Sequence, residues 1–202
     1  MKPKTSNPFQ RILPVFLLAV CGTSQAGVGV AYKLEPKQSQ VTFVLQATGH
    51  KVHGKTSALK GEFVLPFKLS GVESSFVAKI EFDAASLDTA NKKRDRKMRT
   101  DSLDVNQYPA IVFLTERIRG EISKIRSGEP AQVTLVGKLT IRDVTRPISV
   151  IANVTRKGEK LHIEGTHVLR FTDYNVPDPS IFLLRVKKDM TIGFSIVCSP
   201  AD

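Results

Sequence analysis

Apolar and polar residues alternate through most of the chain beyond residue 30, and this pattern constrains the fold more than any other feature of the sequence. In residues 131–141, Val133, Leu135 and Leu139 share one face and are separated mostly by polar residues. A repeat of two residues is that of a β-strand with one buried face. Similar runs occupy residues 31–34, 41–47, 56–67, 72–82, 110–114, 148–154, 161–171 and 190–198. The pattern predicts an all-β fold, a single antiparallel barrel or sandwich of about eight strands.

Residues 88–102 depart from this alternation. The segment begins with Asp88, a candidate N-cap, and six of the eight residues from 92 to 99 are basic. It has little to bury besides Ala90 and Met98. We therefore expect one short helix that lies against one end of the strands.

The first 26 residues have the order that is typical of a secretory signal peptide. Three basic residues precede the apolar residues 12–21, and Ser24-Gln25-Ala26 follows. We predict cleavage before Gly27, which leaves 202 − 26 = 176 residues (27–202) as one domain in the periplasm or outside the cell. In the alternative, residues 18–21 act as a lipobox, and Cys21 anchors a lipoprotein to the membrane.

The charge of the chain bears on its partners. Of the net charge of +11, three positive charges lie in the predicted signal peptide, which leaves 11 − 3 = +8. Nucleic acid is disfavoured as a partner because no aromatic residues interleave with the basic ones and because export removes the chain from the cytoplasm. An anionic membrane surface needs only the charge and is the better candidate. No apolar run reaches the ~18 residues that a membrane-spanning helix requires.

Four segments of the chain resemble the YceI-like family of lipid- and polyisoprenoid-binding proteins. The two most specific are the run GKLTIRDVTRP at residues 137–147 and the segment that begins with SLDT at 86–89 and continues with Arg94-Asp95, Met98-Arg99 and YPAIVF at 108–113. The other segments are YKL at 32–34 with Ser39, Val41 and Phe43, and TDY at 172–174 with Val186 and Asp189. Together they cover nearly all of the predicted mature chain.

The resemblance implies a lipocalin-like antiparallel barrel that holds a long isoprenoid, a quinone or another lipid chain and performs no chemistry. A carrier of this kind needs no cofactor other than the bound lipid, and a homodimer is left open. Alternation by itself favours a barrel filled by its own side chains. In that alternative the protein is a secreted binding module whose basic surface binds anionic lipids or membranes.

The inward faces of the predicted strands are aliphatic and rich in phenylalanine, which suits a hydrocarbon occupant. His167 is the one ionisable residue on them and is either a buried neutral histidine or a ligand contact. The residues that we expect to line the cavity and bind lipid are Phe43, Leu45, Phe76, Ile80, Phe82, Phe113, Val133, Leu135, Leu169, Phe171 and Phe194.

The basic segment has two interpretations. If the helix lies at the barrel mouth, Arg94, Lys97 and Arg99 are candidates to bind a phosphate or diphosphate head group. The other interpretation is a solvated helix face, in which Asp95 and Arg99 form a weak i,i+4 pair. Arg94 has a further alternative, because the adjacent Asp95 indicates that the two residues act as a structural latch.

Motifs for catalysis or metal binding are missing from the sequence. It contains no nucleophile elbow, phosphate-binding loop, dinucleotide fingerprint or paired carboxylates. His50 and His53 are three residues apart, so on an extended backbone their rings point to opposite faces and do not share a metal. We therefore expect neither an enzyme nor a metal protein.

Overall fold

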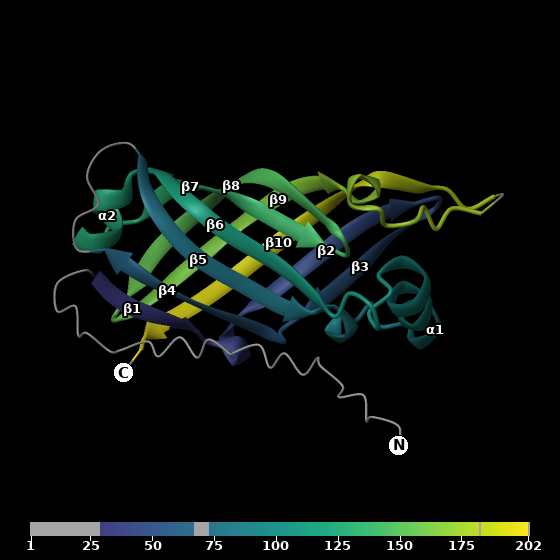
Figure 1. Cartoon of the computed structure of the whole chain (residues 1–202), viewed down its shortest axis with the longest axis horizontal. Helices are drawn as coiled ribbons and strands as arrows, with labels where there is room; N and C mark the ends of the chain where they lie inside the picture. The colour runs from purple at the N-terminus through teal and green to yellow at the C-terminus, as the bar shows by residue number, and fades with distance from the viewer. Residues whose placement is uncertain (1–28, 67–72, 182, 202) are drawn as a thin grey trace, which may run out of the picture.

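A computed structural model describes residues 29–66, 73–181 and 183–201 (Figure 1), so the predicted signal peptide, its cleavage site and Cys21 lie outside the described residues. Ten antiparallel strands form one sheet. The strands are β1 (Gly29–Leu34), β2 (Gln40–Ala47), β3 (His50–Thr56), β4 (Leu59–Pro66), β5 (Glu73–Asp83), β6 (Ala110–Gly120), β7 (Ala131–Ile141), β8 (Val144–Lys157), β9 (Lys160–Arg170) and β10 (Val186–Pro200).

Eight of these strands close into a barrel. The order β1-β4-β5-β6-β7-β8-β9-β10 returns to its start because the end of β10 pairs with β1, with Cys198 opposite Leu34. The rest of β10 pairs with β2, and β2 pairs with β3. The hairpin β2–β3 therefore extends the wall toward one end of the barrel (Figure 1). The predicted all-β barrel is confirmed.

At two positions in the barrel wall, two short successive strands take the place of one long strand. β1 and β2 both lie along β10 and are separated by the 3₁₀ turn η1 (Pro36–Gln38), where Pro36 has no N–H to donate to a ladder. β3 and β4 are separated at residues 57–58, where Thr56 Oγ1 accepts a hydrogen bond from the Ala58 N–H at 3.1 Å. Sequence patterning did not predict β3, because Val52 is its only large apolar residue.

Short turns join the long strands β7, β8 and β9. Arg142 and Asp143 alone connect β7 to β8, and Gly158 and Glu159 alone connect β8 to β9. Gly158 supplies a positive φ of 61°, and Arg142 adopts φ 54° although it has a side chain. Such tight turns make consecutive strands neighbours in the sheet. The wall on this side is therefore one continuous meander.

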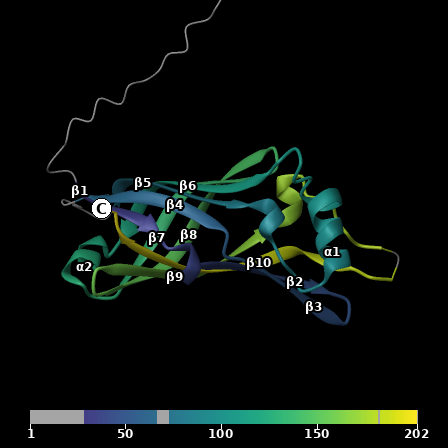
Figure 2. The ribbon, with the colours of Figure 1, turned by 90° about the horizontal axis from the view of Figure 1, so that it is seen from below.

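The basic segment forms a helix at one end of the barrel (Figures 1 and 2). It comprises α1 (Lys92–Lys97) and a π-helical turn, η3 (Met98–Ser102). The predicted helix is confirmed, but the N-cap is Asn91 rather than Asp88, since Asn91 Oδ1 accepts from the Arg94 N–H at 3.0 Å. Before α1, the 3₁₀ turn η2 (Ala84–Ser86) leads the chain out of β5.

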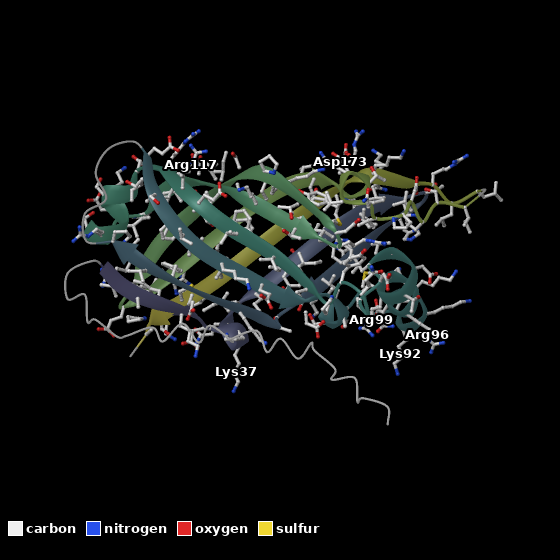
Figure 3. All side chains as sticks on the ribbon, viewed as in Figure 1. Lys37, Lys92, Arg96, Arg99, Arg117 and Asp173 are labelled. Atoms are coloured by element: carbon white, nitrogen blue, oxygen red, sulfur yellow. The ribbon has the colours of Figure 1, made fainter. Side chains whose placement is uncertain are left out.

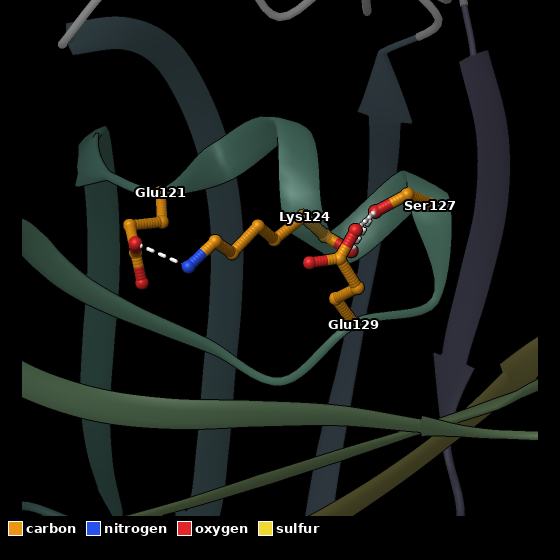
Figure 4. A network of polar contacts seen from close by, with 4 residues as sticks. All are labelled: Glu121, Lys124, Ser127 and Glu129. Carbon is orange, nitrogen blue, oxygen red and sulfur yellow. Dashed lines mark hydrogen bonds and ion pairs between the residues drawn. The ribbon is translucent and has the colours of Figure 1, made fainter.

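A second short helix, α2 (Ile122–Ser127), lies at the opposite end and was not predicted. Its Ile122 and Ile125 are 2% and 3% exposed and face the interior. The outer side is polar: Lys124 forms an ion pair with Glu121, and Ser127 Oγ lies 3.0 Å from a carboxylate oxygen of Glu129 (Figure 4). α2 therefore covers this end of the barrel with its apolar side turned inward.

The buried residues form two clusters, one toward each helix. The α2-end cluster includes Leu59, Phe76, Ile118, Ile122, Ile125, Val133 and Leu161. The α1-end cluster includes Phe43, Ala84, Leu87, Leu103, Ile111, Ile141, Leu169, Phe171 and Tyr174. The last two belong to the 3₁₀ turn η4 (Phe171–Tyr174), which follows β9. Segments outside the strands thus complete the core at both ends.

Candidate lipid-binding cavity

A cavity of about 150 Å³ lies inside the barrel. Its wall draws side chains from both clusters, from Ile125 on α2 to Leu169 near the α1 end. A single water molecule needs only ~10–15 Å³, so this space is many times larger than a packing defect. Among the described lining residues, only Thr115 and His167 have polar side chains. The barrel is therefore hollow and its interior is apolar.

Eight of the eleven residues expected to line the cavity are in its wall. They are Phe76, Ile80, Phe82, Phe113, Val133, Leu135, Leu169 and Phe194. Each lies on the inward face that the alternation indicated, and β5 keeps this face despite a register shift between Ser75 and Ala78. Contact of these residues with a lipid stays a prediction.

Phe43, Leu45 and Phe171 are not among the described residues that line this cavity, and their contact with a lipid stays a prediction. All three belong to the α1-end cluster or pack against it. The ring of Phe43 packs over Gly54 on the neighbouring strand β3. A Cβ atom at position 54 would come within 2.2 Å of this ring. Phe171 has left the strand and begins η4. Alternation reports the face of a residue, but it does not report the residue's position along the barrel axis.

Several lining residues were missed by sequence reasoning. Phe63 on β4 stacks on Tyr32 with ring centroids 5.4 Å apart and meets Phe76 edge-on at 5.3 Å. Its strand was predicted, but no inward face was assigned to it. Ile125 belongs to α2, and its spacing of three residues from Ile122 was the available signal.

His167 is in the cavity wall, and burial lowers the pKa of its imidazole below 6.5. The ring is therefore neutral at pH 7, with one nitrogen that donates and one that accepts. No hydrogen bond to the ring is found among the described residues. His167 thus offers an unused polar contact inside an apolar cavity.

Asp95 organises the segment around α1 from a buried position, with 6% of its surface exposed. Its Oδ1 accepts hydrogen bonds from the backbone N–H and the hydroxyl of Thr89. Burial raises the pKa of this carboxyl, but the Thr89 hydrogen bonds and the charge of Arg99 more than offset burial, so the pKa lies below 3.8. Asp95 therefore remains a carboxylate and fixes α1 to the preceding loop.

The three candidate head-group residues have different surroundings. Arg94 donates from Nε to Thr89 Oγ1 at 2.8 Å and from Nη2 to Thr89 O at 2.7 Å, so it acts as the structural latch of the alternative interpretation. Arg99 donates from Nη2 to Leu87 O at 3.2 Å and lies beside Lys92 and Arg96 (Figure 3). Lys97 is exposed. Binding of a head group by Lys97 or Arg99 stays a prediction.

Arg142 is a further cation at this end, and sequence reasoning gave it no role. Its Nη1 donates to Ser102 O at 2.6 Å, and its guanidinium carbon lies 5.3 Å from the centre of the Tyr108 ring. The contact joins the β7–β8 turn to η3. Arg142 therefore holds the end of the segment at Ser102 against the strands, whereas Arg94 binds Thr89 at its beginning.

Metal ligands and reactive groups were also sought in the described part of the chain. No cluster of three His, Cys, Asp or Glu side chains that could hold a metal ion occurs there. Burial raises the pKa of the Cys198 thiol to about 12, so the thiol stays protonated at neutral pH. In the same residues, no helix has the length and apolar character needed to cross a membrane.

A closed antiparallel barrel with an apolar interior places the protein in the lipocalin-like class. The model of the YceI-like domain matches residues 32–198, and the chain belongs to this family. The resemblance noted from the sequence is thereby confirmed.

Relatives and solved structures agree with this membership. A UPF0312 protein of Enterobacter sp. (strain 638) is 24% identical over 177 residues, which cover 83% of this chain and 86% of the relative. A polyisoprenoid binding domain from Saccharophagus degradans, implicated in plant cell wall breakdown, has a TM-score of 0.69 at 16% identity and covers 85% of this chain and 99% of its own. BcnA of Burkholderia cenocepacia has a TM-score of 0.66 at 18% identity, with coverage of 81% and 98%. At these identities the two structures establish the fold.

Proposed function

We propose that this protein binds a long-chain isoprenoid or another lipid in its barrel and carries it through the periplasm. The observation that carries the proposal is the apolar cavity, which the filled-barrel alternative does not provide. Membership in the YceI-like family supports the proposal, as does the structural similarity to a polyisoprenoid binding domain.

Apolar burial would supply the affinity. Removing a CH₂ group from water contributes ~0.8 kcal/mol, so a chain of many such groups binds without a strong polar anchor. His167 could add one hydrogen bond to a carbonyl or hydroxyl group of the ligand, which is the chemistry of a quinone or an alcohol. The proposal assigns no catalytic step.

The bound chain has a preferred direction in this proposal. α2 covers one end of the cavity with the buried side chains of Ile122 and Ile125, and its ion pair between Glu121 and Lys124 lies on the outer side. The α1 end has the exposed cation Lys97 and the partly buried Arg99. The tail would therefore point toward α2 and the head group toward α1. Since the guanidinium of Arg94 is already bonded to Thr89, we assign Arg94 to structure rather than to the head group.

The experiment is lipid analysis of the protein purified from its native host. Mass spectrometry of an organic extract should give a long-chain isoprenoid, quinone or fatty acyl compound in about equal amount to the protein. Peptide mapping of the same sample should give an N-terminus at Gly27, which supports a soluble carrier. A lipidated Cys21 would replace that carrier with a membrane-tethered one, and an extract without lipid would contradict the proposal.

A further inference from the structure

An apolar turn projects from the α1 end of the barrel. The chain between η4 and β10 leaves the wall and, among the described residues, lies farthest from α2 (Figures 1 and 2). Ile181, Leu183 and Leu184 in this turn are 69%, 81% and 38% exposed. Single exposed apolar residues are common on soluble proteins, but three at one projecting tip indicate a binding surface.

The turn is held in a defined shape. The backbone N–H of Ile181 donates to Leu184 O and that of Leu184 to Ile181 O, both at 2.9 Å. At its base, Thr48 on the β2–β3 turn donates its N–H to Arg185 O at 2.9 Å, and its Oγ1 accepts from the Arg185 N–H at 3.0 Å. Val186 donates its N–H to Ser180 Oγ at 2.9 Å. The tip can therefore enter an apolar medium with these backbone groups already satisfied.

Basic residues are concentrated at this end of the barrel. Residues 178–188 hold Arg185, Lys187 and Lys188 against one acidic residue, Asp178, so their net charge is 3 − 1 = +2. Residues 92–99 of the basic segment, which lies at the same end of the barrel, hold six basic residues and one acidic residue, which gives 6 − 1 = +5. No ion pair within 4.0 Å involves Arg185, Lys187, Lys188 or any residue of 92–99 in the described part of the chain.

We propose that this turn docks the protein on an anionic phospholipid bilayer, with Ile181, Leu183 and Leu184 in the interface and the cations of this end on the head groups. The apolar side chains at the tip suit the acyl-chain boundary of the bilayer, and the cations suit its anionic head groups. A stable contact with another protein typically buries ~800 Å² on each partner, and a small convex tip does not supply this area. Docking would turn the α1 end of the cavity toward the membrane, where a carrier would exchange its lipid. Only this consequence rests on the proposed carrier function, and binding of the turn to the bilayer does not.

The test is flotation of the protein with vesicles of phosphatidylcholine and phosphatidylglycerol in equal amounts. Leu183→Asp should lower the affinity for these vesicles about tenfold or more, because a leucine that docking would bury in the membrane is replaced by a charge that the anionic surface repels. Val77→Asp is the matched control: Val77 is 65% exposed on β5, in the half of that strand that begins near α2. The control adds the same charge and should bind like the wild type.

The proposal would be overturned by equal binding of wild type and Leu183→Asp, by equal loss in both Asp variants, or by equal binding to pure phosphatidylcholine. Self-association of the wild type without vesicles, abolished by Leu183→Asp, would also overturn it and assign the turn to a second copy of this chain.

A variant with a blocked cavity separates docking from lipid carriage. Ala78 is 6% exposed in the cavity wall, and Ala78→Phe should bind vesicles like the wild type. If Ala78→Phe loses vesicle binding and Leu183→Asp keeps it, the vesicles bind through the cavity rather than through the turn. This result would contradict docking. Vesicle binding by a protein that carries no extractable lipid would keep the docking proposal and remove the carrier.

Discussion

The two helices at the ends of the barrel are held by different interactions. At the α2 end, the helix itself inserts Ile122 and Ile125 into the core, and Arg117 and Arg119 nearby are both bound to Glu73. At the α1 end, Leu87 and Leu103 flank the helix and join the core, but α1 itself is held by polar contacts that centre on Asp95. Arg117 and the group Lys92, Arg96 and Arg99 mark these two ends in Figure 3.

The difference indicates which end can admit a ligand. An apolar plug is stabilised by burial and leaves a cavity if it moves, so opening it costs the full hydrophobic free energy. A polar latch can exchange its hydrogen bonds for bonds to water at a smaller net cost. We therefore interpret the α2 end as the closed floor of the barrel and the α1 end as its mouth.

The largest expected effect is at the floor. Ile122→Ala removes a side chain that is 2% exposed and should lower the free energy of unfolding by about 2–5 kcal/mol. Ile151→Ala, at a residue that is 56% exposed on the outer wall, should change it by about 0.5 kcal/mol or less. Urea unfolding of both variants measures the difference. Equal stabilities would mean that α2 does not plug the barrel.

A smaller effect is expected at the latch. Asp95→Ala leaves the Thr89 N–H without its acceptor and should cost about 1–3 kcal/mol. Hydrogen exchange should show faster opening of residues 88–102 and unchanged protection of α2. If α2 opens equally, the two ends are coupled and the distinction between floor and mouth fails.

The charge of Asp95 also predicts a pH dependence. Because its folded-state pKa lies below 3.8, the carboxylate stabilises the fold above that pH, and this stabilisation is lost as the pH falls through the folded-state pKa. In Asp95→Asn this part of the acid dependence should be missing. Urea unfolding between neutral and acidic pH tests this, and identical acid dependence in both proteins would contradict the role of Asp95.

His167 in the cavity wall predicts a second pH dependence. Burial lowers its folded-state pKa below 6.5, so the unfolded chain takes up the proton first as the pH falls. Stability from the neutral ring is complete above the unfolded-state pKa and is lost as the pH falls through 6.5 toward the folded-state pKa. His167→Leu should remove this slope. A slope that persists in the variant would mean that another group causes it.

The smallest effect concerns the head group. Lys97 is exposed, so Lys97→Ala should cost about 1 kcal/mol or less in affinity for a diphosphate-headed isoprenoid, and the loss should shrink with added salt. Affinity for the matching neutral alcohol should not change. Arg99→Ala is less clean because it also removes the hydrogen bond to Leu87 O. Equal losses for both ligands would show that Lys97 does not contact the head group.

How far the sequence predicts this molecule depends on how local each feature is. The inward faces of β5, β6, β7 and β10 follow from alternation, which is why Phe76 and Phe113 were placed correctly in the wall. Alternation carries no information on position along the barrel axis, so Phe43 and Phe171 were expected in the cavity wall although they pack in the α1-end cluster. α2 was missed because six residues give too short a helical pattern.

The partners of the basic segment depend on tertiary structure. Arg94 and Arg99 were correctly placed at one end of the barrel, but their bonds to the carbonyl oxygens of Thr89 and Leu87 depend on how the preceding loop folds back. The same holds for Arg142, whose partner Ser102 lies 40 residues earlier in the chain. The pattern of charges in the sequence shows where such cations lie. It does not show which of them form hydrogen bonds within the protein and which are free to contact a ligand.

The most direct test of the hollow barrel compares two neighbouring residues of β5. Ala78 is 6% exposed and lines the cavity, whereas Val77 is 65% exposed on the outer surface. Ala78→Phe should fold normally because the cavity has room for the ring, and it should lose the extractable lipid. Val77→Phe should keep the lipid at the wild-type ratio. Overpacking a filled core typically costs ~1–3 kcal/mol, so marked destabilisation of Ala78→Phe together with a wild type that carries no lipid would contradict the account.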